Sequence, residues 1–321
     1  MDLNVKSFAL LINIYKKNLD LLSYFYPVLD LFSSYQSNSM LTSTATDIGT
    51  SKVGIFITLS RDASDSKDIF KDVIDKLKKR YPNIHIDVIE NKGYDIGALL
   101  YSFKNIKSYE YVLRLHSKNK VKYLERIISI LVSSKSQIVK ALQIFSSNPK
   151  IALICSDVHF QPKMKSLRLR RNTYYLNQLA KQYKFKQQYT NTSFIIGTMF
   201  WVRTSFFAKL NKRLNFQTTY YHMNTINDLD WHWYYQQYKS IVDFDSDIKN
   251  KQSPESHEII KSRVIQHWKT APKSKFAPNY YKASQLNHSH VIRDGMLGNA
   301  YERFFSWAAY QLNYTVETIS L

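Results

Sequence analysis

The stretch that decides the fold runs from residue 53 to residue 89 and begins with the apolar run Val53-Gly-Ile-Phe-Ile-Thr-Leu59. It ends with a second run of this kind, Ile84-His-Ile-Asp-Val-Ile89. Between the two runs, apolar side chains recur at helical spacing from Ile69 to Leu77. Capping residues, Ser64-Asp-Ser66, come before this repeat, and the cations Lys78-Lys-Arg80 lie in its last turn. The stretch therefore predicts a strand, a helix and a second strand.

The same alternation continues on both sides of this stretch. Further strand-like runs are Phe8–Tyr15, Tyr111–Leu115 and Ile151–Cys155, and helical periodicity covers Leu19–Phe32 and Tyr123–Phe145. The strand-like runs are too continuous in apolar residues to be half exposed, which is typical of a sheet covered on both faces. We therefore predict an α/β, Rossmann-like fold with a mostly parallel central sheet and helices on both faces. In such a fold, functional side chains are expected directly after the strands.

The rest of the chain is less regular. Residues 33–51 are rich in Ser and Thr and predict a surface loop, whereas residues 160–190 are basic and predict a mobile insertion. Phe194–Val202 predicts a further strand, with Gly197 where a ligand or backbone comes close. An aromatic-rich region follows, and a final helix is predicted from Leu297 to Leu312.

Net charge is concentrated in one part of the chain. The chain carries 45 Lys and Arg against 25 Asp and Glu, a formal net charge of +20. Residues 158–227 contain 12 bases and no acid, so this segment alone supplies +12 of that charge. A solvated basic surface is the simplest interpretation; contact with phosphate groups, an acidic lipid surface or nucleic acid is the alternative.

Other features of the sequence bear on where in the cell the protein is expected to lie. No apolar run approaches the roughly 20 residues that cross a bilayer. Cys155 is the single cysteine, so no internal disulfide is expected, and the beginning of the sequence has no small-residue cleavage site. We therefore expect a cytoplasmic protein without a membrane span.

Two segments at strand ends carry the chemistry. In Glu90-Asn-Lys-Gly-Tyr-Asp-Ile-Gly-Ala98, Gly93 permits a tight turn and Asp95 is placed either to cap the following helix or to accept hydrogen bonds from ribose or sugar hydroxyls. In Leu113-Arg-Leu-His-Ser-Lys-Asn-Lys120, His116 and Lys118 leave a buried strand. These two potential cations suit a diphosphate group.

Four segments in order resemble the signatures of the rhamnan synthesis F family of glycosyltransferases, whose fold is similar to that of the GT-A glycosyltransferases. The resemblance implies transfer of a sugar, often rhamnose or another deoxysugar, from a nucleotide-sugar donor during bacterial surface polysaccharide assembly. The four segments are Asn91–Gly97, Tyr111–Lys118, Phe194–Arg203 and Asp294–Phe305.

Carried over by position, the resemblance implies two groups of site residues and no metal ligands. Donor-binding residues would be Asn91, Gly93, Tyr94, Asp95, His116, Ser117 and Lys118. Substrate-binding residues would be Gly197, Trp201, Glu302 and Arg303, although Glu302 and Arg303 are equally explained as an ion pair that anchors a helix. His116 and Lys118 stand where other GT-A enzymes have an Asp-x-Asp metal pair, so we expect no divalent metal and no other cofactor.

An inverting transfer needs a carboxylate base for the acceptor hydroxyl. As this base we prefer Asp230 or Asp228, which come before an aromatic helix, over Asp294. The alternative role of Asp294 is to cap a helix. We expect one glycosyltransferase domain over residues 1–321, with the nucleotide-sugar part at about 5–157, the basic insertion at about 158–192 and the acceptor part at about 193–321.

The expected partners are a nucleotide-sugar donor, a glycan or lipid-linked glycan acceptor and, through residues 158–227, an anionic membrane surface. The protein would then lie at the inner face of the cytoplasmic membrane. Two alternatives stay open: a nucleic-acid-binding protein, which the charge permits but which lacks a recognised motif, and a glycan-binding protein that has lost catalysis.

Overall fold

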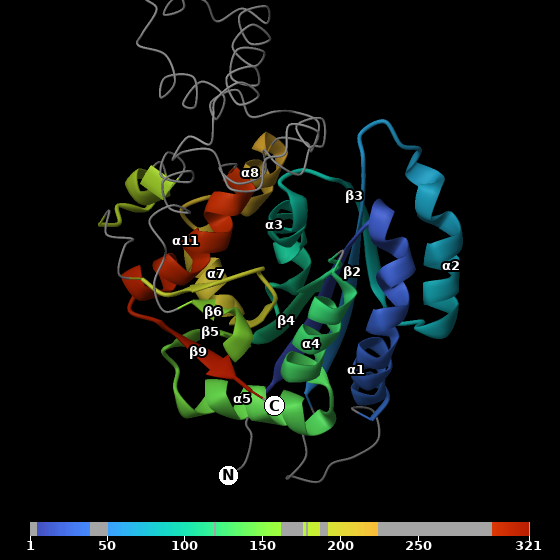
Figure 1. The fold of residues 1–321 in the computed structure, drawn as a ribbon, viewed down its shortest axis with the longest axis horizontal. Coiled ribbons are helices and arrows are strands. Elements are labelled where there is room, and N and C mark those ends of the chain that lie inside the picture. The colour runs from blue at the N-terminus through green and yellow to red at the C-terminus, as the bar shows by residue number, and fades with distance from the viewer. Residues whose placement is uncertain are drawn as a thin grey trace, which may run out of the picture.

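The computed structural model describes residues 5–38, 51–118, 120–161, 176–177, 179–186, 192–223 and 297–320. Their strands form one seven-stranded sheet in the order β3-β2-β1-β4-β8-β5-β9 and a two-stranded sheet of β6 and β7 (Figure 1). The strands are β1 Ser7–Tyr15, β2 Lys52–Arg61, β3 His85–Glu90, β4 Tyr111–His116, β5 Ile151–Ser156, β6 Phe160–Gln161, β7 Phe194–Ile195, β8 Phe200–Arg203 and β9 Thr315–Ile319.

Helices connect most of these strands. The α-helices are α1 Tyr26–Asn38, α2 Lys71–Arg80, α3 Tyr94–Ile106, α4 Val121–Val132, α5 Lys135–Ser147, α7 Thr204–Asn211, α8 Phe216–His222 and α11 Leu297–Gln311. The shorter 3₁₀ segments are η1 Lys16–Phe25, η3 Lys67–Phe70 and η4 Asp157–His159.

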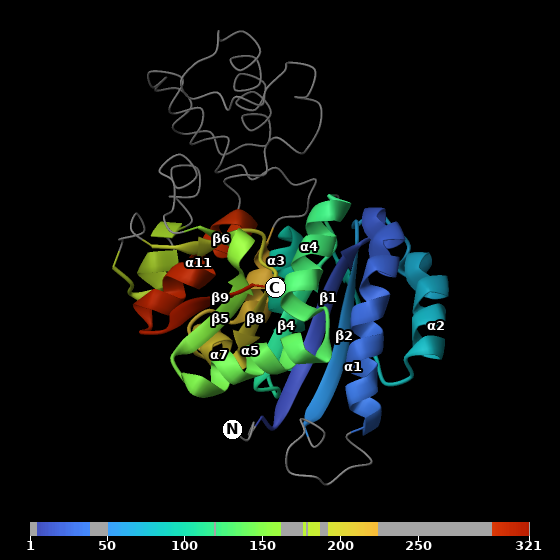
Figure 2. The same cartoon turned by 60° about the horizontal axis from the view of Figure 1, so that its bottom comes forward.

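The sheet is parallel apart from one strand. Strands β2 and β4 both pair in parallel with β1, and β3 pairs in parallel with β2. Strand β8 lies antiparallel between β4 and β5, and β9 pairs in parallel with β5. The carboxyl ends of β1 to β4 therefore share one edge of the sheet, and β1 with β4 forms its centre (Figure 2).

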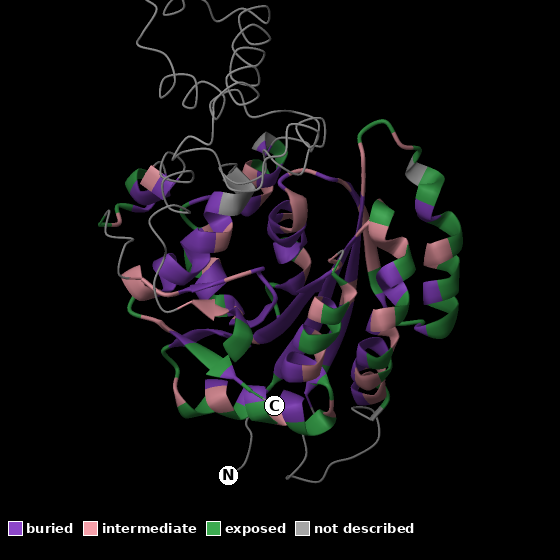
Figure 3. Ribbon diagram, viewed as in Figure 1, coloured by how far each residue is buried: buried purple, intermediate pink, exposed green. Residues whose placement is uncertain are grey.

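Helices cover both faces of the sheet, each over its own apolar core. Strand β1 alternates between the cores: Phe8 and Leu10 face the core that includes α1, α4 and α5, whereas Ala9 and Leu11 face the core that includes α3, α7 and α11. All nine residues of β1 except Tyr15 are buried, which is why its sequence shows no polar alternation (Figure 3). The predicted fold class, a mostly parallel sheet with helices on both faces, is confirmed.

The predicted strand–helix–strand unit is present; of the predicted capping residues Ser66 caps η3, whereas α2 begins after Phe70 without a side-chain cap. Ser66 Oγ accepts a hydrogen bond from the Asp68 amide at the start of η3. Helix α2 then ends at Arg80, after the three cations and two residues before Pro82. Local propensity and tertiary structure agree here because the exposed face of the helix consists of charged residues.

Three predictions need correction, and one strand was missed. The continuous helix expected over residues 123–145 is two helices, because Ser134 accepts from the Gln137 amide and starts α5. The strand expected over 194–202 is divided into β7 and β8 by a turn around Gly197. Residues 33–38, expected as the start of a loop, belong to α1, which continues to Asn38. Strand β9 was not anticipated.

No single described helix is long and apolar enough to cross a membrane. Helices α4 and α5 pass the length and hydropathy criteria only as a pair, which is bent by 64°. Residues buried on this pair, such as Ile127 and Leu142, contribute to the core beneath the sheet.

Candidate functional site

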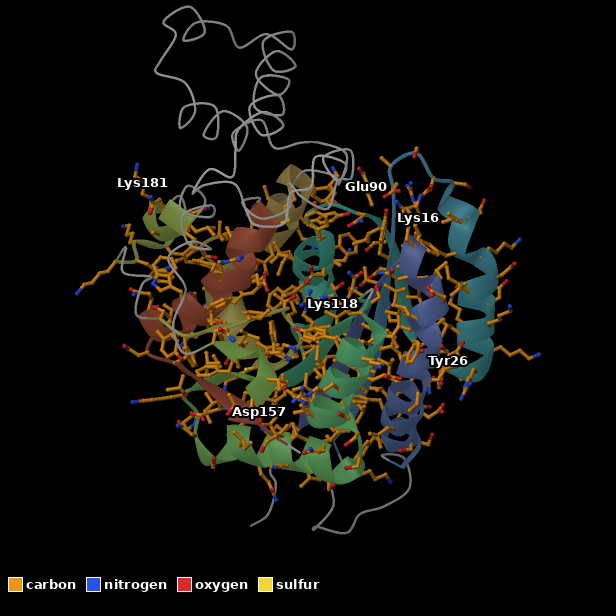
Figure 4. The ribbon with its side chains drawn as sticks, in the orientation of Figure 1. Lys16, Tyr26, Glu90, Lys118, Asp157 and Lys181 are labelled. Carbon is orange, nitrogen blue, oxygen red and sulfur yellow. The ribbon has the colours of Figure 1, made fainter. Side chains whose placement is uncertain are left out.

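Polar side chains gather where the carboxyl ends of β1 and β4 meet. Strands β2 and β3 lie on one side of β1 and β4 lies on the other, so this is the switch point of the sheet, where α/β proteins bind ligands. The Ser117 amide donates to Asn13 O at 2.8 Å, and Ser117 Oγ accepts from the Tyr15 amide at 3.3 Å. Figure 4 shows Lys118 toward the centre of the molecule and Lys16 and Glu90 at the upper rim. The predicted donor residue Ser117 thus joins the two central strands.

The turn after β3 brings the first group of predicted residues to this edge. The Asn91 amide donates to Arg61 O at 2.7 Å, and Asn91 is buried. Gly93 and Tyr94 have φ of +60° and +55°, so the N-cap residue and the first residue of α3 are both left-handed. A Cβ on Gly93 would lie 2.2 Å from Met223 Sδ. Glycine is required at this position for both reasons, in agreement with the predicted tight turn.

One interpretation of the sequence proposed that Asp95 caps α3. In the structure it does not. Gly93 occupies the N-cap position without a side-chain hydrogen bond. The Asp95 carboxylate instead accepts from Arg114 Nη2 at 3.0 Å and from Thr198 Oγ1. Arg114 is 1% exposed and also donates to the backbone oxygens of Asp95 and Thr198. One guanidinium therefore joins β4, the start of α3 and the turn before β8.

The charges in this cluster determine its protonation. Burial alone would raise the pKa of Asp95, but the neighbouring His116 and Arg114 and the hydrogen bonds from Thr198 and Arg114 hold it well below its usual range. Burial lowers the pKa of the Arg114 guanidinium, and Asp95 opposes that shift. The pair is therefore an ionised carboxylate and a charged guanidinium, and the carboxylate side chain keeps 27% of its surface exposed.

His116, the first of the two potential cations expected at the end of β4, is part of the same cluster. Its Nε2 contacts Gly197 O at 2.6 Å and lies 3.6 Å from Asp95 Oδ2, while Nδ1 lies 3.0 Å from Ser117 O. Burial lowers the pKa of His116, and the charge of Asp95 opposes that shift. Gly197 O can only accept, so Nε2, which makes the shorter contact, is assigned as a donor. His116 thus holds the turn at Gly197.

Gly197 is contacted by side chains from several elements around the switch point. Its φ is +85°, and its amide donates to Glu302 Oε1 of α11 at 2.6 Å. A Cβ at this position would lie 2.9 Å from Lys118 Nζ and 3.1 Å from Tyr123 Oη. The predicted close approach at this glycine is present, and the groups that approach it are an ammonium and a phenol.

Lys118 is the available cation of the predicted pair. It is half-buried, and its Nζ lies 4.6 Å from the centre of the Tyr123 ring. No acidic side chain of the described residues lies within ion-pair distance of Lys118. An anionic ligand would thus meet an ammonium without a carboxylate partner.

The remaining predicted residues divide into three groups. Trp201 is 0% exposed in the core beneath α1 and α4, where Nε1 donates to Leu131 O, so its predicted contact with substrate is not supported. Glu302 reaches the site through Gly197, and its carboxylate lies 3.6 Å from Arg303 Nη1, as the ion-pair interpretation expected. Asp228, Asp230 and Asp294 lie outside the described residues.

Sequence reasoning missed Arg114 and Thr198. A signal for Arg114 was available, since a charged residue in the middle of an apolar strand needs a buried partner. Thr198 gave no such signal, because a threonine after a glycine is common in turns. Its φ of +52° and its contact with Asp95 follow from the tertiary structure alone.

No group of three or more His, Cys, Asp or Glu side chains that could hold a metal ion is present in the part of the chain that the structure describes. Among the predicted donor-binding residues the carboxylate is that of Asp95, whose Oδ2 accepts from Arg114 and Thr198.

A mostly parallel sheet with polar side chains at its switch point defines the class of α/β proteins that bind ligands at the carboxyl edge of the sheet. Within this class, the family described as rhamnan synthesis protein F matches residues 35–228, more than half of the chain. The chain belongs to this family. The match includes the first three signature segments, whereas Asp294–Phe305 lies beyond it. Membership supports glycosyltransferase activity in the synthesis of polysaccharide.

Other comparisons add little. No curated protein matches the chain. The crystal structure of residues 1–349 of TarS from S. aureus is similar with a TM-score of 0.30 and 12% identity, over 87% of this chain and 77% of that one. A similarity of this size carries no inference about fold or function.

Proposed function

We propose that the protein transfers a sugar, such as rhamnose or another deoxysugar, from a nucleotide-sugar donor to a growing surface polysaccharide or lipid-linked glycan. The observation that carries the proposal is Lys118, a half-buried cation at the switch point without an acidic partner among the described residues. Sugar transfer leaves a nucleotide diphosphate whose negative charge must be neutralised. An ammonium beside the departing oxygens would do this, which supports transfer without a divalent metal.

The donor would lie along the carboxyl edge of the sheet. The turn Asn91–Asp95 and Ser117 border this edge, and the Gly197 turn closes it next to Lys118. The buried bridge from Arg114 to Asp95 and Thr198 keeps these turns in one arrangement. Such preorganisation matters because a site that is already ordered loses less entropy when substrate binds.

An inverting reaction is part of the proposal, with Asp230 or Asp228 as the base and Asp294 as the rival. The base would take the proton of the acceptor hydroxyl as the hydroxyl oxygen attacks the anomeric carbon and the diphosphate leaves. Replacing each residue in turn by Asn, with donor binding measured separately, identifies the base. An Asp230→Asn variant with unimpaired turnover excludes the first choice.

Donor use can be tested directly. Thermal shift against UDP, GDP, dTDP and CMP sugars selects the donor, and release of the nucleotide then measures transfer. Lys118→Met should lower turnover by about 100-fold, comparable to the loss of one group that stabilises developing charge. Lys120→Met is the matched control, because Lys120 is exposed two residues away. Equal activity of the two variants contradicts the proposed role of Lys118.

Metal dependence has its own test. Transfer should continue in EDTA, and loss of activity that Mn²⁺ restores refutes metal-independent transfer.

Membrane contact is a separate part of the proposal. The absence of acidic residues from residues 158–227 supports contact with anionic lipid at the inner face of the cytoplasmic membrane. Vesicles of anionic lipid should sediment the protein at low salt and release it at high salt. No binding at low salt refutes this part and leaves the proposed chemistry unaffected.

A further inference from the structure

Three polar side chains from three different elements meet beside Gly197: Lys118 after β4, Tyr123 in the first turn of α4 and His159 at the end of η4. We call them the Tyr123 cluster. The centres of the Tyr123 and His159 rings are 4.6 Å apart with an interplanar angle of 80°, and Lys118 Nζ lies 4.6 Å from the centre of the Tyr123 ring. Lys118 Nζ and Tyr123 Oη both approach the position of a Cβ on Gly197 to about 3 Å. Lys118 Nζ and Tyr123 Oη therefore approach one position, and the His159 ring lies edge-on against the Tyr123 ring beside them.

His159 is the unusual member of the cluster. Its side chain is 2% exposed, yet neither ring nitrogen has a hydrogen-bond partner in the described part of the chain. Its backbone oxygen accepts from the Ile196 amide at 2.9 Å, which joins η4 to the segment just before Gly197. A buried polar group without a partner is costly, and phenylalanine would fill the same space without that cost. The imidazole therefore points to a polar ligand.

The charge around the cluster favours an anion. Lys118 lacks an acidic partner among the described residues, and α4 begins without a side-chain cap at Lys120, so its positive end remains uncompensated by a side chain there. Two carboxylates lie near the cluster. Glu302 accepts from the Gly197 amide, and Asp157 accepts from the Val158 amide. Both carboxylates already accept a hydrogen bond, whereas the Lys118 ammonium has no carboxylate partner among the described residues.

The protonation state of His159 fits the same ligand. Burial lowers its pKa to about 4, and Lys118 and Arg126 act in the same direction. At neutral pH the ring therefore carries one N–H donor and one acceptor nitrogen. Burial also raises the pKa of Tyr123 to about 12, so its hydroxyl keeps its proton and can donate. An ammonium, a phenol and an imidazole N–H together match the oxygens of a phosphate group.

We propose that Lys118, Tyr123 and His159 form a binding site for a phosphate group, in which His159 and Tyr123 act as ligands in addition to the predicted donor residues. The source of the phosphate rests on the proposed function: it is either the diphosphate of the nucleotide-sugar donor or the phosphate of a lipid-linked acceptor. The phosphate chemistry is common to both sources.

The experiment measures binding of inorganic pyrophosphate to the full chain by calorimetry. His159→Phe preserves the ring against Tyr123 and removes both nitrogens, and should weaken binding by at least about tenfold, the loss expected for one buried hydrogen bond. His85→Phe is the matched control, because the His85 side chain is 49% exposed at the start of β3, and should bind as the unmodified protein does. The Tm of His159→Phe should be unchanged or higher.

Equal pyrophosphate affinity of His159→Phe and the unmodified protein overturns the proposal, and so does a lower Tm without loss of affinity, since that result is typical of a purely structural histidine. If His159→Phe does not fold, the pyrophosphate affinity of Tyr123→Phe tests the proposal instead. This variant loses only the hydroxyl and should weaken pyrophosphate binding by at least about threefold; unchanged binding overturns the proposal.

Two further arms identify the source of the phosphate. Binding of UDP, GDP, dTDP and CMP that depends on His159 supports the donor, whereas dependence confined to vesicles that contain a polyprenyl phosphate supports the acceptor. If no ligand shows the dependence, the phosphate site is refuted, while sugar transfer by the same protein upholds the proposed function. If pyrophosphate binding depends on His159 but the protein transfers no sugar, the phosphate site is upheld and the proposed glycosyltransferase activity is refuted.

Discussion

Replacing Arg114 by Met tests whether the buried bridge organises the switch point. The guanidinium is 1% exposed and donates to the Asp95 carboxylate at 3.0 Å, to Asp95 O at 2.6 Å and to Thr198 O. Met fills a similar volume in the strand but donates no hydrogen bond, so each of three oxygens loses one donor. The change therefore acts on β4, α3 and the Gly197 turn together.

The size of the effect follows from the burial of the pair. Breaking a buried ion pair by removing one partner costs about 3–5 kcal/mol. Because 27% of the Asp95 side chain is exposed, water can solvate part of the stranded carboxylate. We therefore expect the free energy of unfolding to fall by about 3 kcal/mol, the lower end of that range.

Equilibrium unfolding in urea, followed by circular dichroism, measures this change. Arg80→Met is the matched control, because Arg80 forms an ion pair with Asp30 in which both side chains are about half exposed. That substitution should cost about 1 kcal/mol or less. If Arg114→Met destabilises the protein no more than Arg80→Met does, the buried bridge has no organising role. Arg114→Lys, which retains one charge but not the fork of donors, should give an intermediate loss.

Three more predictions concern single groups. Since the pKa of Asp95 is lowered in the folded state, its carboxylate stabilises the fold at pH values above its ordinary pKa of 3.8 and loses this effect as the pH falls below that value. Asp95→Asn should therefore flatten the acid limb of a plot of Tm against pH. An unchanged acid limb contradicts the lowered pKa. A Cβ on Gly97 would lie 1.6 Å from Lys92 O, so Gly97→Ala should cost about 3 kcal/mol in urea unfolding, and a neutral substitution refutes the close approach. Burial raises the pKa of the Cys155 thiol to about 12, so reaction with a disulfide reagent should occur only at the rate of unfolding; rapid labelling of the folded protein refutes its burial.

Much of the framework could be predicted from local patterns. Five strands, from β1 to β5, were expected as runs of apolar residues, and all five form. The helix between β2 and β3 was expected from its repeat and its caps. These predictions succeed because a strand buried on both faces must be apolar throughout, and a helix with one buried face must repeat its apolar residues every three or four positions.

The site was predicted in position but not in detail. Asn91, Asp95, Ser117 and Lys118 follow strands whose carboxyl ends share an edge, as the parallel topology requires. One of the two roles considered for Asp95 is wrong, since Asp95 does not cap its helix. The cause is packing: the buried Arg114 engages the Asp95 carboxylate instead.

By itself, the amino-acid sequence determined the α/β class, the order of the first five strands along the chain and the location of the polar residues at strand ends, because these depend on local periodicity. Only the tertiary structure decided that β8 enters the sheet antiparallel, that Arg114 finds Asp95, and that His159 lies beside Tyr123. These pairs are separated by 19 or more positions along the chain. Their partners are selected by the need to satisfy charge and hydrogen bonds in a shared interior, and no local pattern records that need.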